Sequence, residues 1–150
     1  MNRTDILSGS PQETFEFGEQ IGRNIQTGDV VLLYGGLGAG KTLLTKGIMN
    51  ALAFDVDEVT SPSFALVNLY KTENFDVYHI DPWRLDKVVD VAAAVGLNEI
   101  LESDRAVAII EWADKLGDFA LPNRTISVFV EGDGDEPRKI SLRTTLREKI

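Results

Sequence analysis

The sequence predicts an α/β protein in which a mixed sheet is flanked by helices. One apolar run, residues 30–34, leads through a glycine-rich stretch into a segment whose apolar residues recur every four positions, as on a helix. A second apolar run covers residues 106–110, and such runs are typical of strands buried on both faces. Strand-like pairs within 64–80 and 125–142 are joined by short polar segments, which favour antiparallel hairpins. We therefore expect a parallel core extended by antiparallel hairpins.

Composition limits the class of protein. The chain has 150 residues, no cysteine and a net charge of −9. Its length predicts one domain over residues 1–150, and the lack of cysteine excludes disulfides and thiolate zinc sites. No run approaches the roughly 20 apolar residues that span a bilayer, so a cytoplasmic location is expected and a membrane one is not. The negative charge repels nucleic acid, so any RNA would be held by a partner, unless the charge serves only solubility.

A helix is predicted to begin near residue 10, where Ser10, Pro11 and Glu13 form an N-terminal capping box. Small and large residues then share one face, which suits close packing against a sheet: Phe15, Gly18, Gly22 and Ile25. Gly28 is expected to end this helix. Thr14, one turn into it, is a candidate for contact with a bound nucleotide, although an exposed position without function is favoured.

The glycine-rich stretch over residues 35–42 has the spacing G-x-x-x-x-G-K-[ST] of a P-loop. Glycines let the backbone approach an anion and turn several N–H groups toward it. A helix that begins here adds its own N–H groups and the positive end of its dipole. Lys41 is expected to reach the β- and γ-phosphates, and the Thr42 hydroxyl to bind Mg²⁺. The expected nucleotide-binding residues of this stretch are Gly35, Gly38, Ala39, Gly40, Lys41, Thr42 and Leu43.

Carboxylates follow two of the predicted strands. Asp81 comes directly after the strand at 75–80, and Glu111 after the apolar run at 106–110. Open α/β sheets bind ligands at this edge, and in P-loop enzymes an acid there binds Mg²⁺ or positions the attacking water. We expect Asp81 and Glu111 to act with Lys41 in catalysis, and to hold Mg²⁺. The competing interpretation of Asp81 is a turn residue before proline.

Several other positions have alternative interpretations. Thr60, in a turn rich in serine and proline, is either a turn residue or part of a loop that senses the γ-phosphate. His79 is expected to be structural. Trp112 either fills the core or belongs to the nucleotide site, and the core is favoured. Residues 87–101 have a helical pattern that Gly96 interrupts, so two short helices are expected there as one alternative.

These residues predict a P-loop NTPase-like protein that binds a nucleoside triphosphate with Mg²⁺ and has groups suited to its hydrolysis. ATP is favoured over GTP, because the chain has no Asn-Lys-x-Asp segment for reading guanine. Two alternatives remain. A small-molecule P-loop kinase would need an arginine-rich lid, for which the chain has little spare length. A nucleotide-dependent switch would bind ATP without useful turnover.

Five segments in this order carry a resemblance to a known family: Glu13-Thr14, Leu37–Thr42, Thr60–Phe64, Tyr78–Asp81 with Arg84-Leu85, and Glu111-Trp112. Together they resemble the TsaE (also YjeE) family, small bacterial ATPases required for threonylcarbamoyladenosine formation in tRNA. The resemblance runs from about residue 10 to residue 142. It implies a partner, the TsaD–TsaB heterodimer, whose TsaD subunit joins threonylcarbamoyl to the tRNA. The ATPase would support repeated turnover of that pair and would meet tRNA only through it.

The resemblance also implies roles for single residues. It gives ATP and Mg²⁺ contacts to four of them: Lys41, Thr42, Asp81 and Glu111. It gives Thr60 a switch-like role, and it matches Arg138 to a basic residue near the nucleotide. One departure stands out, because Gly36 occupies a position where the family usually has Asp. Backbone contacts to phosphate need no side chain there, so binding should survive. Any part that this carboxylate plays in turnover or partner contact in the family would be missing here.

Overall fold

The computed structural model describes residues 2–36, 40–60, 62, 66–83, 85, 90–116, 124–132 and 136–145. The strands are β1 (Asn2–Ser8), β2 (Val30–Tyr34), β3 (Val67–Lys71), β4 (Asp76–Ile80), β5 (Ala106–Glu111), β6 (Thr125–Glu131) and β7 (Arg138–Thr145). The helices are α1 (Pro11–Arg23), α2 (Lys41–Ala51), α3 (Val91–Val95) and α4 (Leu97–Leu101), with short 3-10 turns η1 (Val56–Glu58) and η2 (Ala113–Leu116). Among the described residues, no helix has both the length and the apolar character needed to cross a bilayer.

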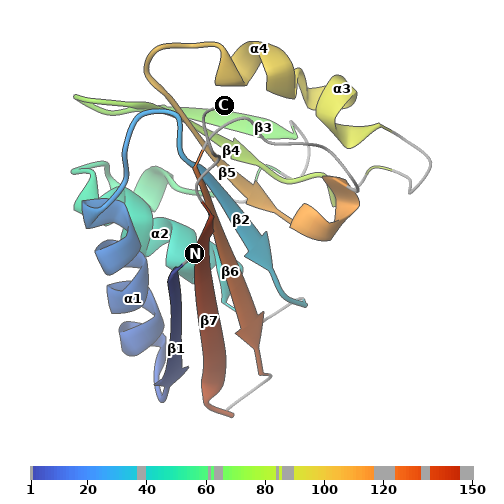
Figure 1. Ribbon diagram of the computed structural model, residues 1–150. Coiled ribbons are helices and arrows are strands. Elements are labelled where there is room, and N and C mark those ends of the chain that lie inside the picture. Colours follow the sequence, from blue (N-terminus) through green and yellow to red (C-terminus); the bar gives the residue numbers. More distant parts are fainter. Residues whose placement is uncertain are drawn as a thin grey trace.

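All seven strands form one mixed sheet in the order β1-β7-β6-β2-β5-β4-β3 (Figure 1). The central strands β6, β2, β5 and β4 are parallel to one another. Strands β3 and β7 pair antiparallel with β4 and β6, and β1 pairs antiparallel with β7. The predicted parallel core with antiparallel hairpins is therefore confirmed.

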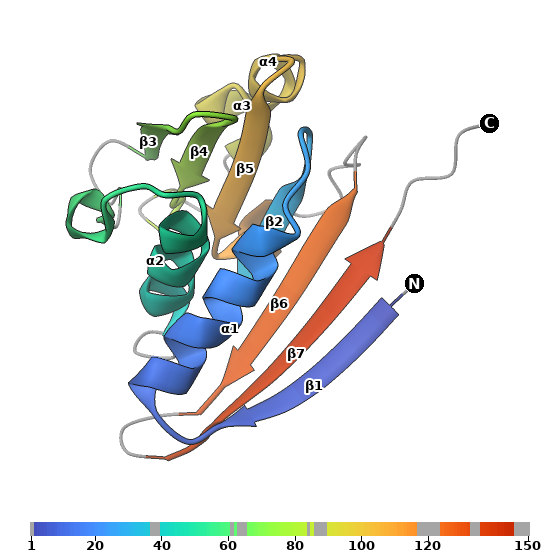
Figure 2. The ribbon, with the colours of Figure 1, turned by 90° about the vertical axis from the view of Figure 1, so that its left-hand side faces the viewer.

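The two faces of the sheet carry separate layers of helices. Figures 1 and 2 show α1 and α2 over one face, with α3 and α4 on the other. Side chains of β2 and β5 alternate between the two cores, because successive residues of a strand point to opposite faces. Val31, Leu33 and Ile109 pack with α1 and α2, whereas Leu32 and Ile110 pack with α3 and α4. Burial on both faces explains why these two strands are continuous apolar runs.

Helix α1 begins as predicted but ends earlier. The Ser10 hydroxyl accepts a hydrogen bond from the Glu13 N–H (3.2 Å), and the Glu13 carboxylate accepts one from the Gly9 N–H (2.7 Å). The predicted end at Gly28 is wrong, since the helix stops at Arg23. The Asn24 side chain donates to the carbonyl oxygen of Gln20 (2.8 Å), so it caps an unpaired group of the last turn.

The small residues of α1 contact a helix and not the sheet. Gly18 and Gly22 lie against α2, where a Cβ added to Gly18 would collide with the carbonyl oxygen of Leu44. Gly47 on α2 lies equally close, and a Cβ there would collide with the carbonyl oxygen of Phe15. The expectation that this face packs against the sheet is therefore wrong. Glycines instead let the two helix backbones touch, which fixes α2 relative to α1.

The contact between α1 and α2 predicts that Gly47→Ala destabilises the protein. In a solvent-exposed helix, replacing glycine by alanine stabilises the helix by about 1 kcal/mol. At position 47 the collision of the new Cβ with the carbonyl oxygen of Phe15 should make the net effect destabilising. We expect urea denaturation to give a free energy of unfolding that is lower by about 1–3 kcal/mol. Gly9→Ala is the matched control, because its Cβ would lie 3.7 Å from the nearest atom, in the flexible Glu13 side chain. An unchanged or higher stability of Gly47→Ala would contradict this packing.

Candidate functional site

Two buried carboxylates lie at the ends of adjacent strands. Glu111 ends β5 and pairs with Leu33 of β2. Asp81 follows Ile80, the last residue of β4, which pairs with Ile110 of β5. Both side chains are almost fully buried, with exposed fractions of 3% for Glu111 and 4% for Asp81. The alternation of the strands turns both toward the face that α1 and α2 cover.

Lys41 begins α2 beside these carboxylates. Its side chain is buried, its Nζ donates to the carbonyl oxygen of Gly35 (2.8 Å), and Nζ lies 3.3 Å from the centroid of the Trp112 ring. Burial lowers the pKa of Lys41, and three nearby carboxylates partly oppose this by raising it: Glu111, Asp81 and Asp114. The structure therefore brings the lysine and both predicted acids together. It adds Asp114, which follows no strand directly and so gave no signal in the sequence.

The start of α2 has the geometry of an anion site. Gly40 is the residue before the helix, with φ 106°, a left-handed conformation that favours glycine. Among the described residues no side chain caps the helix, so its first N–H groups are available to an anion, which they would stabilise. Thr42 and Leu43 lie half-buried in this first turn. Gly38 and Ala39, also predicted to bind nucleotide, lie outside the described residues.

Thr14 packs against the end of this loop. The side chain is buried, and its Oγ1 lies 2.7 Å from Oγ of Ser8. Its Cγ2 would lie 3.6 Å from a Cβ at Gly40. The expectation of an exposed Thr14 is therefore wrong. Arg138 begins β7 opposite Ser8, and its guanidinium donates to the carbonyl oxygen of Glu136 (2.6 Å). Both predicted contacts thus lie at the edge of the sheet that carries the loop.

Trp112, whose ring lies against the Lys41 ammonium, contacts a second tryptophan, Trp83. The Trp83 and Trp112 ring centroids are 4.6 Å apart. Trp112 is half-buried, with a φ of 53° that is uncommon outside glycine, so the expectation of a core residue is wrong. The Asp81 carboxylate accepts from the Trp83 N–H (3.0 Å), which means that Asp81 also has the predicted turn role. Lys115 holds the same turn by donating to the carbonyl oxygen of Trp83 (3.1 Å).

His79 contacts a predicted catalytic residue. The ring is completely buried, and Nε2 lies 2.6 Å from Oε2 of Glu111. Its Nδ1 lies 3.0 Å from the Tyr70 hydroxyl. His79 is thus a core residue, as expected, but it is joined to the site as well. The signal for this was its position two residues before Asp81, which places both side chains on the same face of β4.

Among the described residues, Thr60 is linked to the site indirectly, through intervening side chains. It is exposed, and its N–H and carbonyl oxygen lie 3.3 Å and 3.0 Å from the Tyr70 hydroxyl oxygen. Ser61 and Ser63, which follow it in the predicted turn, lie outside the described residues. Thr60 is therefore connected to Glu111 by way of Tyr70 and His79.

The oxygen ligands present suit Mg²⁺. Within the described ranges, no group of three or more histidine or acidic side chains converges to bind a metal alone. Mg²⁺ in nucleotide sites is usually held by one or two protein oxygens together with phosphates and water. The Thr42 hydroxyl at the start of α2 and the carboxylates of Asp81 and Glu111 are donors of the kind that this ion prefers.

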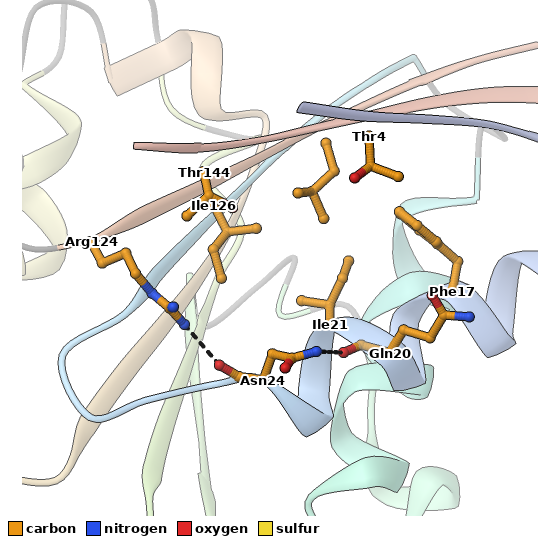
Figure 3. Close-up of a pocket in the computed structure, with 9 residues that line it drawn as sticks. Thr4, Phe17, Gln20, Ile21, Asn24, Arg124, Ile126 and Thr144 are labelled. Atoms are coloured by element: carbon orange, nitrogen blue, oxygen red, sulfur yellow. Dashed lines mark hydrogen bonds between the residues drawn. The ribbon is translucent and has the colours of Figure 1, made fainter. Parts of the chain in front are cut away.

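A pocket of 340 Å³ lies elsewhere, between α1 and the strands β1, β6 and β7 (Figure 3). It is lined by Thr4, Phe17, Gln20, Ile21, Asn24, Arg124, Ile126, Leu142 and Thr144. Arg124 immediately precedes β6 and bonds Asn24 (2.8 Å) and Asp29 (2.9 Å). The pocket thus reaches the edge of the sheet where β6 begins, opposite to the edge that carries Glu111. None of the predicted site residues lines it.

Known proteins match most of the chain. The family described as "Threonylcarbamoyl adenosine biosynthesis protein TsaE" matches residues 8–140. A tRNA threonylcarbamoyladenosine biosynthesis protein TsaE from Treponema pallidum is 33% identical over 136 residues, covering 91% of this chain and 97% of that protein. The protein of the same name from Bacillus subtilis is 31% identical over 133 residues, covering 89% and 80%. The crystal structure of Bacillus subtilis YdiB gives a TM-score of 0.74 at 27% identity, covering 97% of this chain and 87% of that one. The chain therefore belongs to the TsaE family.

Proposed function

We propose that this protein binds ATP with Mg²⁺ at the loop between β2 and α2 and hydrolyses it, in support of threonylcarbamoyladenosine formation in tRNA. The family and its named relatives suggest the pathway. One observation supports the proposed ATP binding and hydrolysis. A buried lysine at the start of α2 lies beside two buried carboxylates at the ends of adjacent strands. Buried charges of both signs around a helix N-terminus fit the binding of a polyanion with its cation.

The lysine and the backbone would stabilise the phosphates. Lys41 exchanges its contacts with Gly35 and the Trp112 ring for phosphate oxygens, and the N–H groups of the first turn of α2 add further donors. Phosphoryl transfer spreads negative charge over the oxygens of the transferred group. Donors fixed in a buried site stabilise that charge without having to reorganise.

The acidic side chains of the site are assigned to binding the metal ion and orienting the attacking water. Thr42, Asp81 and Glu111 would hold Mg²⁺, which when bound neutralises part of the charge on the phosphates. Glu111 is also the group placed to orient the attacking water, because it ends the strand next to β2, from which the phosphate-binding loop leaves. Thr14, Thr60 and Arg138 remain candidates for contacts to the nucleotide at the margin of the site.

The substrate tRNA would be reached through a partner. A net charge of −9 disfavours direct binding to nucleic acid. We propose that the protein acts on the TsaD–TsaB heterodimer, as its family resemblance implies, and supports repeated turnover of that complex. In this proposal the protein works in the cytoplasm, together with the tRNA-modifying partner.

Lys41→Ala should weaken ATP binding and abolish turnover, because it removes the ammonium from the phosphate site. Losing a hydrogen bond to a charged group predicts an affinity about 10- to 100-fold lower by calorimetry. Lys46→Ala is the control, since this lysine lies on the same helix outside the proposed site. Phosphate release by Lys41→Ala at the wild-type rate would refute the site.

Glu111→Gln should keep ATP binding within a few fold but lower the rate of phosphate release at least about 100-fold, because it removes the charge that orients water and metal. Glu131→Gln is the matched control: this exposed acid ends β6, the other neighbour of β2. If Glu111→Gln lost ATP binding while turnover persisted, the role given to Glu111 would be wrong.

The proposed TsaD–TsaB partner leads to a further prediction. We expect slow phosphate release by the protein alone, a faster rate with TsaD–TsaB, and ATP-dependent capture of the protein by that pair in a pull-down. Rapid release that TsaD–TsaB leaves unchanged would count against this partner. Transfer of phosphate to an added metabolite would indicate a kinase, and binding with no release under any condition would indicate a switch.

A further inference from the structure

A chain of side-chain contacts runs from the buried site to an exposed loop. The Glu111 carboxylate meets Nε2 of His79 at 2.6 Å, and Nδ1 of His79 meets the Tyr70 hydroxyl at 3.0 Å. That hydroxyl oxygen then meets the carbonyl oxygen of Thr60 at 3.0 Å and its N–H at 3.3 Å. Glu111, His79 and Tyr70 are buried, whereas Thr60 is exposed. The chain therefore connects a proposed catalytic group with the segment that follows η1.

Counting donors and acceptors shows how these groups depend on one another. An ionised carboxylate only accepts, so Nε2 of His79 carries a hydrogen and donates it to Glu111. Burial raises the pKa of Tyr70, so its hydroxyl keeps the hydrogen. That single hydrogen has two acceptors within reach, Nδ1 of His79 and the Thr60 carbonyl oxygen. Because Asn68 also donates to this carbonyl (3.2 Å), the Tyr70 hydrogen can go to His79 while Thr60 stays paired.

His79 does more than fill the core. A buried imidazole must have its ring nitrogens paired, because an unpaired buried polar group is costly. Backbone groups would meet that need in a residue that serves packing alone. Here both nitrogens are instead paired with side chains, and one of these belongs to Glu111. His79 pairs with Ile109 in the register of β4 and β5, so its ring reaches diagonally to the residue two positions further along β5.

We propose that His79 is a positioning residue for Glu111, and that Tyr70 ties this pair to the backbone of Thr60. The inference rests on the proposed function, since it assigns Glu111 to ATP hydrolysis. A glutamate side chain has three rotatable bonds, and a fixed contact to one carboxylate oxygen sets the direction of the other. Groups that orient a catalytic or metal-binding side chain in this way typically account for about 10- to 100-fold in activity or metal affinity.

Two substitutions at His79 separate its two contacts. The side-chain amide nitrogen of glutamine reaches about as far as Nε2, so His79→Gln can still donate to Glu111. The side-chain amide of asparagine reaches only as far as Nδ1, so in His79→Asn its oxygen can still accept from the Tyr70 hydroxyl while the contact with Glu111 is lost. We expect His79→Asn to lower kcat for ATP about 10- to 100-fold with KM near wild type. His79→Gln should restore most of kcat, and circular dichroism should show that both variants are folded.

The outcomes distinguish this inference from the proposed function. Equal kcat values for folded His79→Gln and His79→Asn, whether lowered together or unchanged together, would overturn the role of His79. Wild-type protein without phosphate release, even with TsaD–TsaB, would instead overturn the proposed function. A fall in ATP affinity equal to the fall in kcat would also overturn the inference, because positioning of Glu111 acts on the reaction and not on binding.

A spectroscopic test does not depend on activity or on variants of His79. The chain contains one histidine, so nitrogen-15 labelling of histidine reports on this ring alone. We expect Glu111→Gln to shift mainly the Nε2 resonance and Tyr70→Phe mainly the Nδ1 resonance. Tyr70→Phe should also lower kcat about fivefold, as loss of one hydrogen bond predicts. A histidine spectrum that neither substitution changes would overturn the chain of contacts.

Discussion

A carboxylate that is cut off from water imposes the strongest constraint on this structure. Glu111 ends a strand that is buried over its whole length, and an isolated charge in such a place is costly. Its neighbours are therefore groups that can accompany a charge: the Lys41 ammonium nearby, and His79 in direct contact. Each of these needs a partner in turn, which brings in Gly35 and Tyr70. The polar groups around the β2–α2 loop follow from placing one acid at the end of β5.

Helix packing decides where the lysine stands relative to that acid. Lys41 is the first residue of α2, and α2 lies directly on the backbone of α1 at Gly18, Gly22 and Gly47. Backbone contact leaves little freedom for one helix to slide on the other, since no side chain can adjust between them. The first turn of α1 also carries Thr14, whose Cγ2 lies on the side of Gly40 where a Cβ would project. The two helices thus hold the N-terminal end of α2, where the proposed nucleotide site lies, as one unit.

The sequence predicted the features that local signals determine. Apolar runs located β2 and β5, polar turns located the hairpins, and the glycine–lysine spacing located the start of α2. It did not predict β1, whose residues Asn2–Ser8 are mostly polar and which is held by pairing with β7 more than by burial, since Leu7 is 64% exposed. The sequence also led to a wrong prediction for the glycine face of α1, which packs against α2 and not against the sheet. A run of small residues shows that something lies close, but not whether that is a sheet or a helix.

Within the site, strand order was the missing information. Asp81 and Glu111 were identified because each follows a strand, but their proximity depends on β5 lying between β2 and β4. The contact between His79 and Glu111 joins positions 32 residues apart, and no local pattern encodes it. Asp114 and Lys115 belong to η2, which contacts β2 and α3. Pairing between distant segments is set by tertiary packing, so residues of this kind are found only when the chain is folded.

The pair of indole rings gives the protein a built-in optical reporter. Both tryptophans of the chain, Trp83 and Trp112, lie in this one pair, and the Lys41 ammonium rests on the Trp112 ring. Indole emission is sensitive to a charge over the ring, and in this protein it originates entirely from the pair of rings beside Lys41. Arrival of an anion that draws the ammonium away from the ring changes that emission without any added dye.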